Sequence, residues 1–236
     1  MIDPGVVLQI RNVTKDYRSL RPLRIERLEM SDRESCALLG FDQVMTEVFV
    51  DLVTGRTVPD TGEIVVCGRP TTAIEDGDAW LKTLNRFGLV SERGVLLAQF
   101  TVEQTLAMPF SLDIDELSEE ARRRVTALAD EVGLGPDLAR QVATLSPLGR
   151  QRLRLACAIS LEPRLLVMEH PNGPLAASEA SAFASDVRRI AGSRAMATVV
   201  LTADETFGEA AAGRVLTLQP ATGELKSPPA WRKWFA

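Results

Sequence analysis

Hydrophobic and polar residues in the first third of the chain follow the patterns typical of β-strands. Residues 23–30 alternate between apolar and polar positions, which is the period of a strand with one buried face. Residues 7–10, 36–39 and 63–67 are short apolar runs, as expected for buried strands. Turn-forming residues at 59–62, Pro-Asp-Thr-Gly, precede the last of these runs. The pattern predicts a β-rich lobe near the N-terminus, which we expect to be antiparallel.

The middle of the chain carries the period of a helix instead. Ser118 is followed by two glutamates and then by apolar residues that recur every three or four positions, up to Gly133. Serine is a favoured N-cap, acidic side chains suit the first turn, and glycine commonly ends a helix. We therefore expect a helix between Ser118 and Gly133, and a second one that begins at Ser146 and stops at Pro163.

The last third alternates between strand and helix. Residues 165–168, 198–201 and 215–218 are predicted strands, and a helix is expected around 179–190. Strands joined by crossover helices form parallel sheets. We expect an α/β fold in one domain over residues 1–236 with a mostly parallel sheet core; the family resemblance described below further implies an antiparallel β-lobe and a helical lobe inserted at about 93–160.

Composition and charge argue against nucleic acid as a partner and against a membrane-spanning or secreted protein. The 236 residues are 45% hydrophobic and 25% charged, with a formal net charge of −5, so duplex nucleic acid is not expected as a partner. No stretch approaches the roughly 20 apolar residues that a membrane span needs, and the N-terminus lacks the pattern of a secretory signal. Cys36, Cys67 and Cys157 lie far apart in apolar runs, which favours buried free thiols in a reducing compartment. We expect a cytoplasmic protein.

Residues 38–55, LLGFDQVMTEVFVDLVTG, have the rhythm of a phosphate-binding loop between a strand and a helix. A working loop reads G-x-x-x-x-G-K-[ST], and it holds phosphate through backbone N–H groups, a lysine and a hydroxyl group that binds Mg²⁺. Here the first glycine is Gly40, but Met45 stands in the place of the second glycine, Thr46 in that of the lysine and Glu47 in that of the hydroxyl.

Each of these changes weakens the expected hold on phosphate. The lost ammonium group forfeits a charge-assisted contact of about 1.5–3 kcal/mol. The Glu47 carboxylate would face the phosphates, and two like charges about 4 Å apart repel by roughly 4 kcal/mol at an effective dielectric of 20. We therefore expect ATP and Mg²⁺ binding to be weak or absent.

Several longer stretches fit one family register around this loop. They are an aromatic residue, Tyr17, ahead of the loop; PDTGEIVVCGRP after its helix; RFGLVSERGVLLAQFTVEQTLAMPF; and LSPLGRQRLRLACAISLEPRLLVMEHP. Over essentially its whole length the chain resembles the ATP-binding cassette subunits of ABC transporters, with a P-loop NTPase-type core. The stretch from Asn85 to Phe110 looks most like cassettes of lipid and lipoprotein traffic.

The resemblance also locates the family's functional positions. Glu92 falls at the Q-loop glutamine, Glu169 at the Walker B aspartate and His170 at the catalytic glutamate. Only Leu145 and Ser146 remain of the signature motif, and alanines stand at the D-loop aspartate and the switch histidine. The nucleotide-binding positions implied by the resemblance are Tyr17, Gly40, Met45, Thr46, Glu47, Val48, Glu92 and Ser146, with Glu169 and His170 at the catalytic places and Glu47 and Glu169 at the metal.

The resemblance implies a subunit on the inner face of the membrane, coupled to an integral-membrane permease and paired with a second cassette, in a homodimer or a heterodimer. With its catalytic positions substituted, the chain is expected to be catalytically silent or very weak. Two alternatives stay open: a divergent but active ATPase in which His170 orients water, and a nucleotide-free scaffold or regulatory protein.

Three features admit a second interpretation. His170, the only histidine, is either a catalytic base or a hydrogen-bonded structural residue. Tyr17, the only tyrosine, either stacks on adenine or covers the edge of a sheet. The tail at 231–235, Trp-Arg-Lys-Trp-Phe, either contacts lipid headgroups or a permease, or folds back onto the domain.

Overall fold

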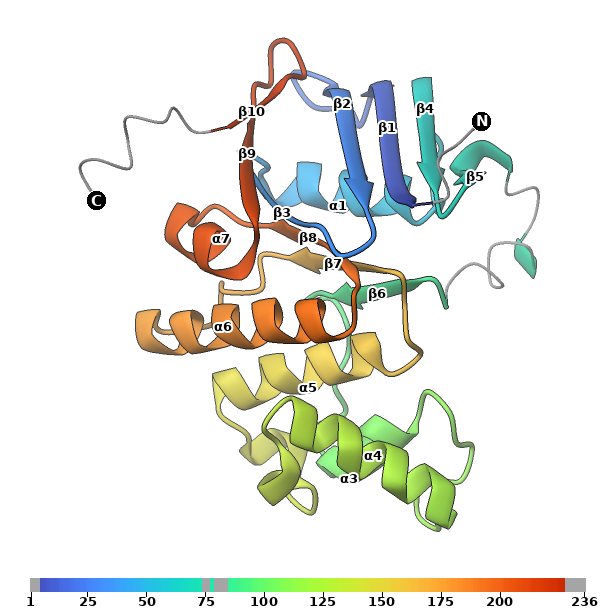
Figure 1. Cartoon of the computed structure of the whole chain (residues 1–236), viewed down its shortest axis with the longest axis vertical. Helices are drawn as coiled ribbons and strands as arrows, with labels where there is room; N and C mark the ends of the chain where they lie inside the picture. Colours follow the sequence, from blue (N-terminus) through green and yellow to red (C-terminus); the bar gives the residue numbers. More distant parts are fainter. Residues whose placement is uncertain (1–4, 74–76, 79–84, 228–236) are drawn as a thin grey trace.

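The computed structural model describes residues 5–73, 77–78 and 85–227. The tail at 231–235 lies outside these residues. Figure 1 shows an antiparallel sheet at one end of the molecule, helices α3 and α4 at the other end, and a second sheet with its helices between them.

The N-terminal lobe is a four-stranded antiparallel sheet. The long strands β1 and β2 pair with Val13 opposite Ile25, and β4 pairs with the other edge of β1. The strand order is β2-β1-β4-β5. The strands are β1 (Val6–Lys15), β2 (Leu23–Ser31), β4 (Thr61–Val66) and β5 (Arg69–Pro70). The expected antiparallel lobe is confirmed, although β4 already begins at Thr61, inside the segment predicted as a turn.

The second sheet has six strands in the order β10-β9-β3-β8-β7-β6. Its neighbours pair in parallel, except that β10 is antiparallel to β9. The crossover connections predicted for the last third of the chain are therefore present. The strands are β3 (Ser35–Leu39), β6 (Phe87–Val90), β7 (Leu165–Glu169), β8 (Ala197–Leu201), β9 (Arg214–Leu218) and β10 (Leu225–Lys226).

The helices begin where their caps predict. Ser118 and Ser146 each accept a hydrogen bond from the backbone N–H three residues on, which starts α4 and α5. Helix α5 stops at Ile159, four residues before the predicted stop at Pro163. The helices are α1 (Gln43–Val53), α3 (Val102–Ala107), α4 (Glu119–Glu131), α5 (Pro147–Ile159), α6 (Ala177–Ser193) and α7 (Glu205–Ala211), with 3₁₀ turns at Thr71–Ala73, Gly135–Asp137 and Val142–Thr144.

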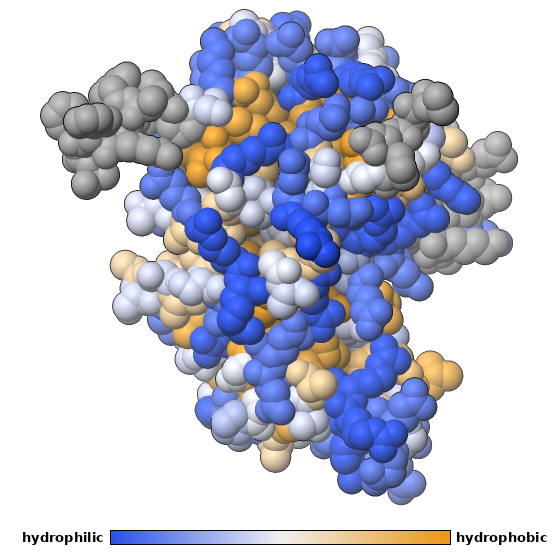
Figure 2. All heavy atoms as spheres, viewed as in Figure 1, coloured by the Kyte–Doolittle hydropathy of each residue, from blue (hydrophilic) through white to orange (hydrophobic). Residues whose placement is uncertain are grey.

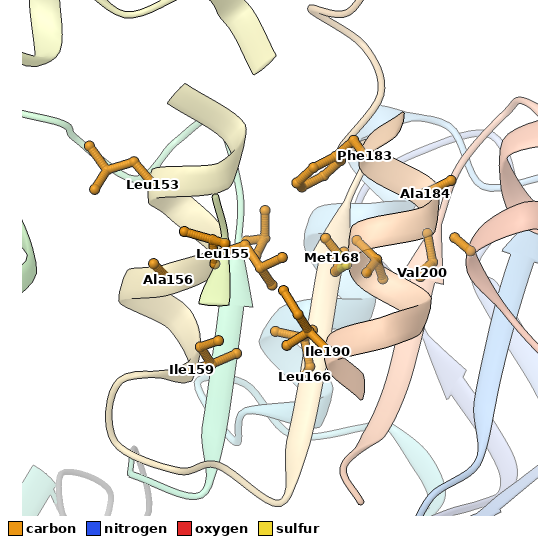
Figure 3. Close-up of a cluster of buried hydrophobic side chains, with 14 of the residues drawn as sticks. Leu153, Leu155, Ala156, Ile159, Leu166, Met168, Phe183, Ala184, Ile190 and Val200 are labelled. Atoms are coloured by element: carbon orange, nitrogen blue, oxygen red, sulfur yellow. The ribbon is translucent and has the colours of Figure 1, made fainter. Parts of the chain in front are cut away.

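Two hydrophobic cores lie on the two faces of the six-stranded sheet. One is shared with the antiparallel sheet and α1, and includes Phe49 and Ile64. The other is shared with the remaining helices; Figure 3 shows Leu155 of α5 and Phe183 of α6 among the side chains that gather around Met168 of β7. β7 is buried at every residue between these cores, which explains why its first four residues, 165–168, are all apolar. The predicted α/β fold, with a mostly parallel sheet, an antiparallel sheet and a helical part, is confirmed.

The surface shown in Figure 2 is mainly hydrophilic, with hydrophobic residues exposed in separate patches. Within the described part of the chain, no helix is both long and apolar enough to cross a bilayer. The three cysteines are free, as expected, but only Cys36 is buried, whereas Cys67 and Cys157 are partly exposed. The prediction of uniformly buried thiols was therefore wrong for two of them.

Candidate nucleotide site

A side chain of the loop before α1 accepts a hydrogen bond from the first turn of this helix. Strand β3 ends at Leu39, and Gly40 takes a φ of +83°, where an added Cβ would lie 3.1 Å from the carbonyl O of Leu218. The Asp42 carboxylate then caps the helix and accepts a hydrogen bond of 2.7 Å from the N–H of Met45. A helix N-terminus attracts anions through its free N–H groups and its dipole. Here an anionic side chain of the same loop takes that position.

Thr46 and His170 contact each other. The Oγ1 atom of Thr46, which is fully buried, lies 3.1 Å from Nε2 of His170, and the two groups share a hydrogen bond. His170 directly follows β7 with a φ of +39°, and its backbone N–H donates to the carbonyl O of Leu201 at 2.8 Å. Thr46 and His170, which the sequence analysis expects at the lysine and glutamate positions, are therefore hydrogen-bonded to each other.

Glu169 carries the most heavily bonded carboxylate of the described site. It is the last residue of β7, only 3% exposed, and it accepts a hydrogen bond from the Ser91 hydroxyl. The Arg93 guanidinium also reaches it at two points: Nε lies 3.1 Å from Oε2, and Nη2 bonds Oε1. The hydrogen bond to Glu169 raises the pKa of Arg93 above its ordinary value. A side-chain cation therefore neutralises this buried acid.

The register of two parallel strands brings these groups together. Val90, the last residue of β6, pairs with Met168 of β7, so the next residues, Ser91 and Glu169, lie side by side. Glu47, on the first turns of α1, accepts a hydrogen bond of 3.1 Å from Gln43 and lies 3.8 Å from Nη1 of Arg93. Arg93 thus links the two candidate metal ligands, Glu47 and Glu169.

A cavity of about 350 Å³ adjoins the loop on the side of the antiparallel sheet. Tyr17 lines it together with Met45 and Asp42, and most of its remaining wall is apolar. Tyr17 also packs against the hydrophobic core below the sheet, which agrees with its interpretation as a covering residue and leaves one face towards the cavity. Residues that complete the lining are Ser19, Leu20, Arg21, Pro22, Leu23, Arg24, Leu218 and Pro220.

Three other predicted positions lie apart from this network of hydrogen bonds. Val48 packs against the core beneath α1. Glu92 is exposed, and its neighbours Ser91 and Arg93 make the contacts with β7 instead. Ser146 is the N-cap of α5, where its hydroxyl accepts a hydrogen bond of 3.1 Å from Gly149.

Sequence reasoning missed Asp42, Ser91 and Arg93. A signal for Asp42 was present, because an aspartate directly before the first residue of a helix is an ordinary N-cap. For Arg93 the signal was indirect: two carboxylates expected at one site, with no lysine in the loop, require a cation from elsewhere.

Comparison with known proteins decides the family. The model of the ABC transporter family, whose members carry an ATP-binding cassette, matches residues 48–172. The chain belongs to this family. Cassettes of this kind bind ATP with Mg²⁺, dimerise and associate with membrane permease subunits.

Two curated cassettes illustrate the range of relatives. The lipoprotein-releasing system ATP-binding protein LolD of Pseudomonas fluorescens is 30% identical over 218 residues, covering 90% of this chain and 95% of LolD. The sulfate/thiosulfate import ATP-binding protein CysA of Thermosynechococcus vestitus is 26% identical over 226 residues, covering 94% of this chain and 64% of CysA. Among solved structures, cbiO1 of Clostridium perfringens superposes with a TM-score of 0.81 at 18% identity, over 98% of this chain and 91% of that one. The cassette fold is thus shared well beyond recognisable sequence identity.

Proposed function

We propose that the chain is a catalytically silent ABC cassette, which keeps the architecture of the family and couples to a membrane permease without hydrolysing ATP itself. The observation that carries the proposal is the hydrogen bond between Thr46 and His170. In the family register these two positions supply the phosphate-binding lysine and the catalytic glutamate. Here both side chains lack the required charge and bond each other.

The remaining residues of the site do not fit Mg-ATP. A β- or γ-phosphate at the start of α1 would lie close to the carboxylates of Asp42 and Glu47. Two like charges about 4 Å apart repel by roughly 4 kcal/mol at an effective dielectric of 20. A divalent cation would compete for Glu169 with a guanidinium that is covalently part of the protein. The carboxylates of Asp42 and Glu47 already supply the negative charge that a phosphate would bring, and the guanidinium of Arg93 supplies the positive charge that Mg²⁺ would bring.

Turnover tests this proposal. The purified chain, alone and with its permease, is expected to show only background ATP hydrolysis, and His170→Ala is expected to leave that background unchanged. Hydrolysis well above background that His170→Ala abolishes would establish the divergent ATPase instead. A related cassette that hydrolyses ATP is measured in the same assay as a positive control.

We further propose that the partners are a permease and a second cassette, in lipid or lipoprotein transport. The match to the ABC transporter family model supports a permease and a second cassette as partners, and the likeness to LolD over 95% of the LolD chain supports the lipoprotein class. The expected docking region is the Q-loop region with the adjoining helices, where Val95, Met108 and Leu112 are exposed at 79%, 42% and 107%. Exposed apolar side chains of this kind suit a protein interface.

Copurification tests the docking region. Val95→Asp and Leu112→Asp are each expected to reduce recovery of the chain with a coexpressed permease encoded beside it. Leu20→Asp is the matched control, because Leu20 is 103% exposed but lies next to the antiparallel sheet. Equal recovery of all three variants would contradict this docking region, and the absence of any neighbouring permease gene would favour the scaffold alternative.

A further inference from the structure

We propose that Arg93 is a positioning residue: it ties the connector, which we define as residues 91–97, to the end of β7 without help from nucleotide or metal. The connector links β6 to the helical part of the cassette, since α3 follows it. The proposal deepens the silent-cassette proposal, but it rests on different residues from those that carry it.

The backbone at the start of the connector is held through Ser91. The Ser91 hydroxyl donates to the Glu169 carboxylate and accepts a hydrogen bond of 3.1 Å from the backbone N–H of Arg93. The N–H of Gly94 donates to the carbonyl O of Ser91 at 3.2 Å. This tight turn holds residues 91–94 next to the last residue of β7, Glu169, and Ser91 itself is buried.

The side chain of Arg93 closes the same turn from outside. Its two-point contact with Glu169 fixes the plane of the guanidinium, because a carboxylate accepts two parallel N–H groups in one orientation only. Glu47 on α1 lies 3.8 Å from the third nitrogen of the group. One arginine therefore joins the connector to two separate elements, β7 and α1.

The far side of the connector is anchored to the helical part of the cassette. The N–H groups of Ala143 and Val142 donate to the carbonyl O atoms of Ala98 and Phe100 at 3.0 and 2.9 Å. Between the two anchors lies the exposed Val95. Loosening the Arg93 anchor should free the connector while the second anchor and the sheet remain in place.

The cation that orders this region is therefore a side chain, which cannot dissociate. A connector ordered by a bound metal ion would respond to its addition or removal, whereas an arginine is covalently part of the chain and needs no added ion. The structure thus assigns the connector one arrangement that is independent of the nucleotide state.

Backbone hydrogen exchange of the intact chain tests the proposal. In Arg93→Ala, the amides of residues 93 and 94 are expected to exchange at least about tenfold faster than in the unmodified chain, since a charge-assisted contact and the turn it closes are lost. Arg93→Lys keeps a charge but not the two-point contact, so an intermediate rate is expected. Arg164→Ala is the control: it removes another arginine–carboxylate pair, with Asp32 at 2.8 Å, and should leave the connector unchanged.

Two results would overturn the proposal. One is equal exchange of the connector in Arg93→Ala and in the unmodified chain. The other is additional protection of the connector when Mg-ATP is added to the unmodified chain. ATP hydrolysis well above background by the unmodified chain, with the Arg93→Ala effect intact, would contradict the silent-cassette proposal and preserve this one, so the two can fail separately. If Arg93→Ala does not fold, as judged by circular dichroism, Arg93→Lys decides the outcome.

Discussion

The hydroxyl of Thr46 lies 3.1 Å from Nε2 of His170, across a sequence separation of 124 residues. Thr46 is fully buried on the first turn of α1, and His170 follows the central strand β7. The contact therefore joins the loop after β3 to the loop after β7, at the edge of the sheet where a cassette binds its nucleotide. Under the silent-cassette proposal, this contact means that the protein closes the site with its own side chains.

The Thr46–His170 hydrogen bond should be measurable as stability. His170→Ala leaves the Thr46 hydroxyl buried without this partner, which typically costs about 1–3 kcal/mol. Denaturant unfolding of His170→Ala is therefore expected to give a lower free energy of unfolding by that amount. Thr46→Val removes the polar group itself, so His170→Ala should cost less in the Thr46→Val background than alone. Equal costs in both backgrounds would show that the two side chains are not coupled.

The turn at Gly62 predicts a second stability effect. Gly62 has a φ of +82°, and a Cβ there would lie 2.3 Å from the backbone O of Asn12. Because backbone cannot move aside as a flexible side chain can, Gly62→Ala should destabilise the protein by more than about 1 kcal/mol. Gly192→Ala is the matched control: no atom lies within 4 Å of its Cβ position, and alanine in α6 should stabilise by up to about 1 kcal/mol. Similar melting temperatures for the two variants would contradict the geometry.

Thiol reactivity provides a third prediction. Burial raises the pKa of Cys36 to about 11 and that of Cys157 to about 12, so at pH 8 almost no thiolate is present at either residue. Burial raises the pKa of Cys67 by less. Cys67 and Cys157 are both partly exposed, so the smaller rise in pKa is what distinguishes Cys67. Iodoacetamide at pH 8 is expected to modify Cys67 first and the other two only after unfolding, as peptide mass spectrometry will show. Equal labelling of all three in the folded protein would contradict this order.

Most of the fold was predictable because its signals are local. The apolar run at 165–168 and the Ser118 cap each depend on neighbouring residues, and both elements appear within a residue or two of their predicted positions. Errors occurred where tertiary pairing decides. Thr61 joins β4 because it pairs with Thr14 of β1, which the turn chemistry of its own segment did not indicate.

The candidate site was harder to predict because its contacts are long-range. Sequence reasoning placed Glu47, Glu169 and His170 at one site from family register, but it expected Glu92 to represent the Q-loop there. The register of β6 against β7 brings Ser91 to Glu169, and the Arg93 side chain contacts the same carboxylate, while Glu92 is exposed. The turn after β6 decides which of residues 91–93 contact Glu169, and no local sequence pattern specifies the geometry of this turn.

Calorimetric titration of the purified chain with Mg-ATP tests the central claim most directly. Because side chains already provide both charges of a bound nucleotide and its metal, we expect no saturable heat up to millimolar Mg-ATP. Saturable binding in the micromolar range would contradict the account, and it would show that the contacts of Asp42 and Arg93 open for nucleotide.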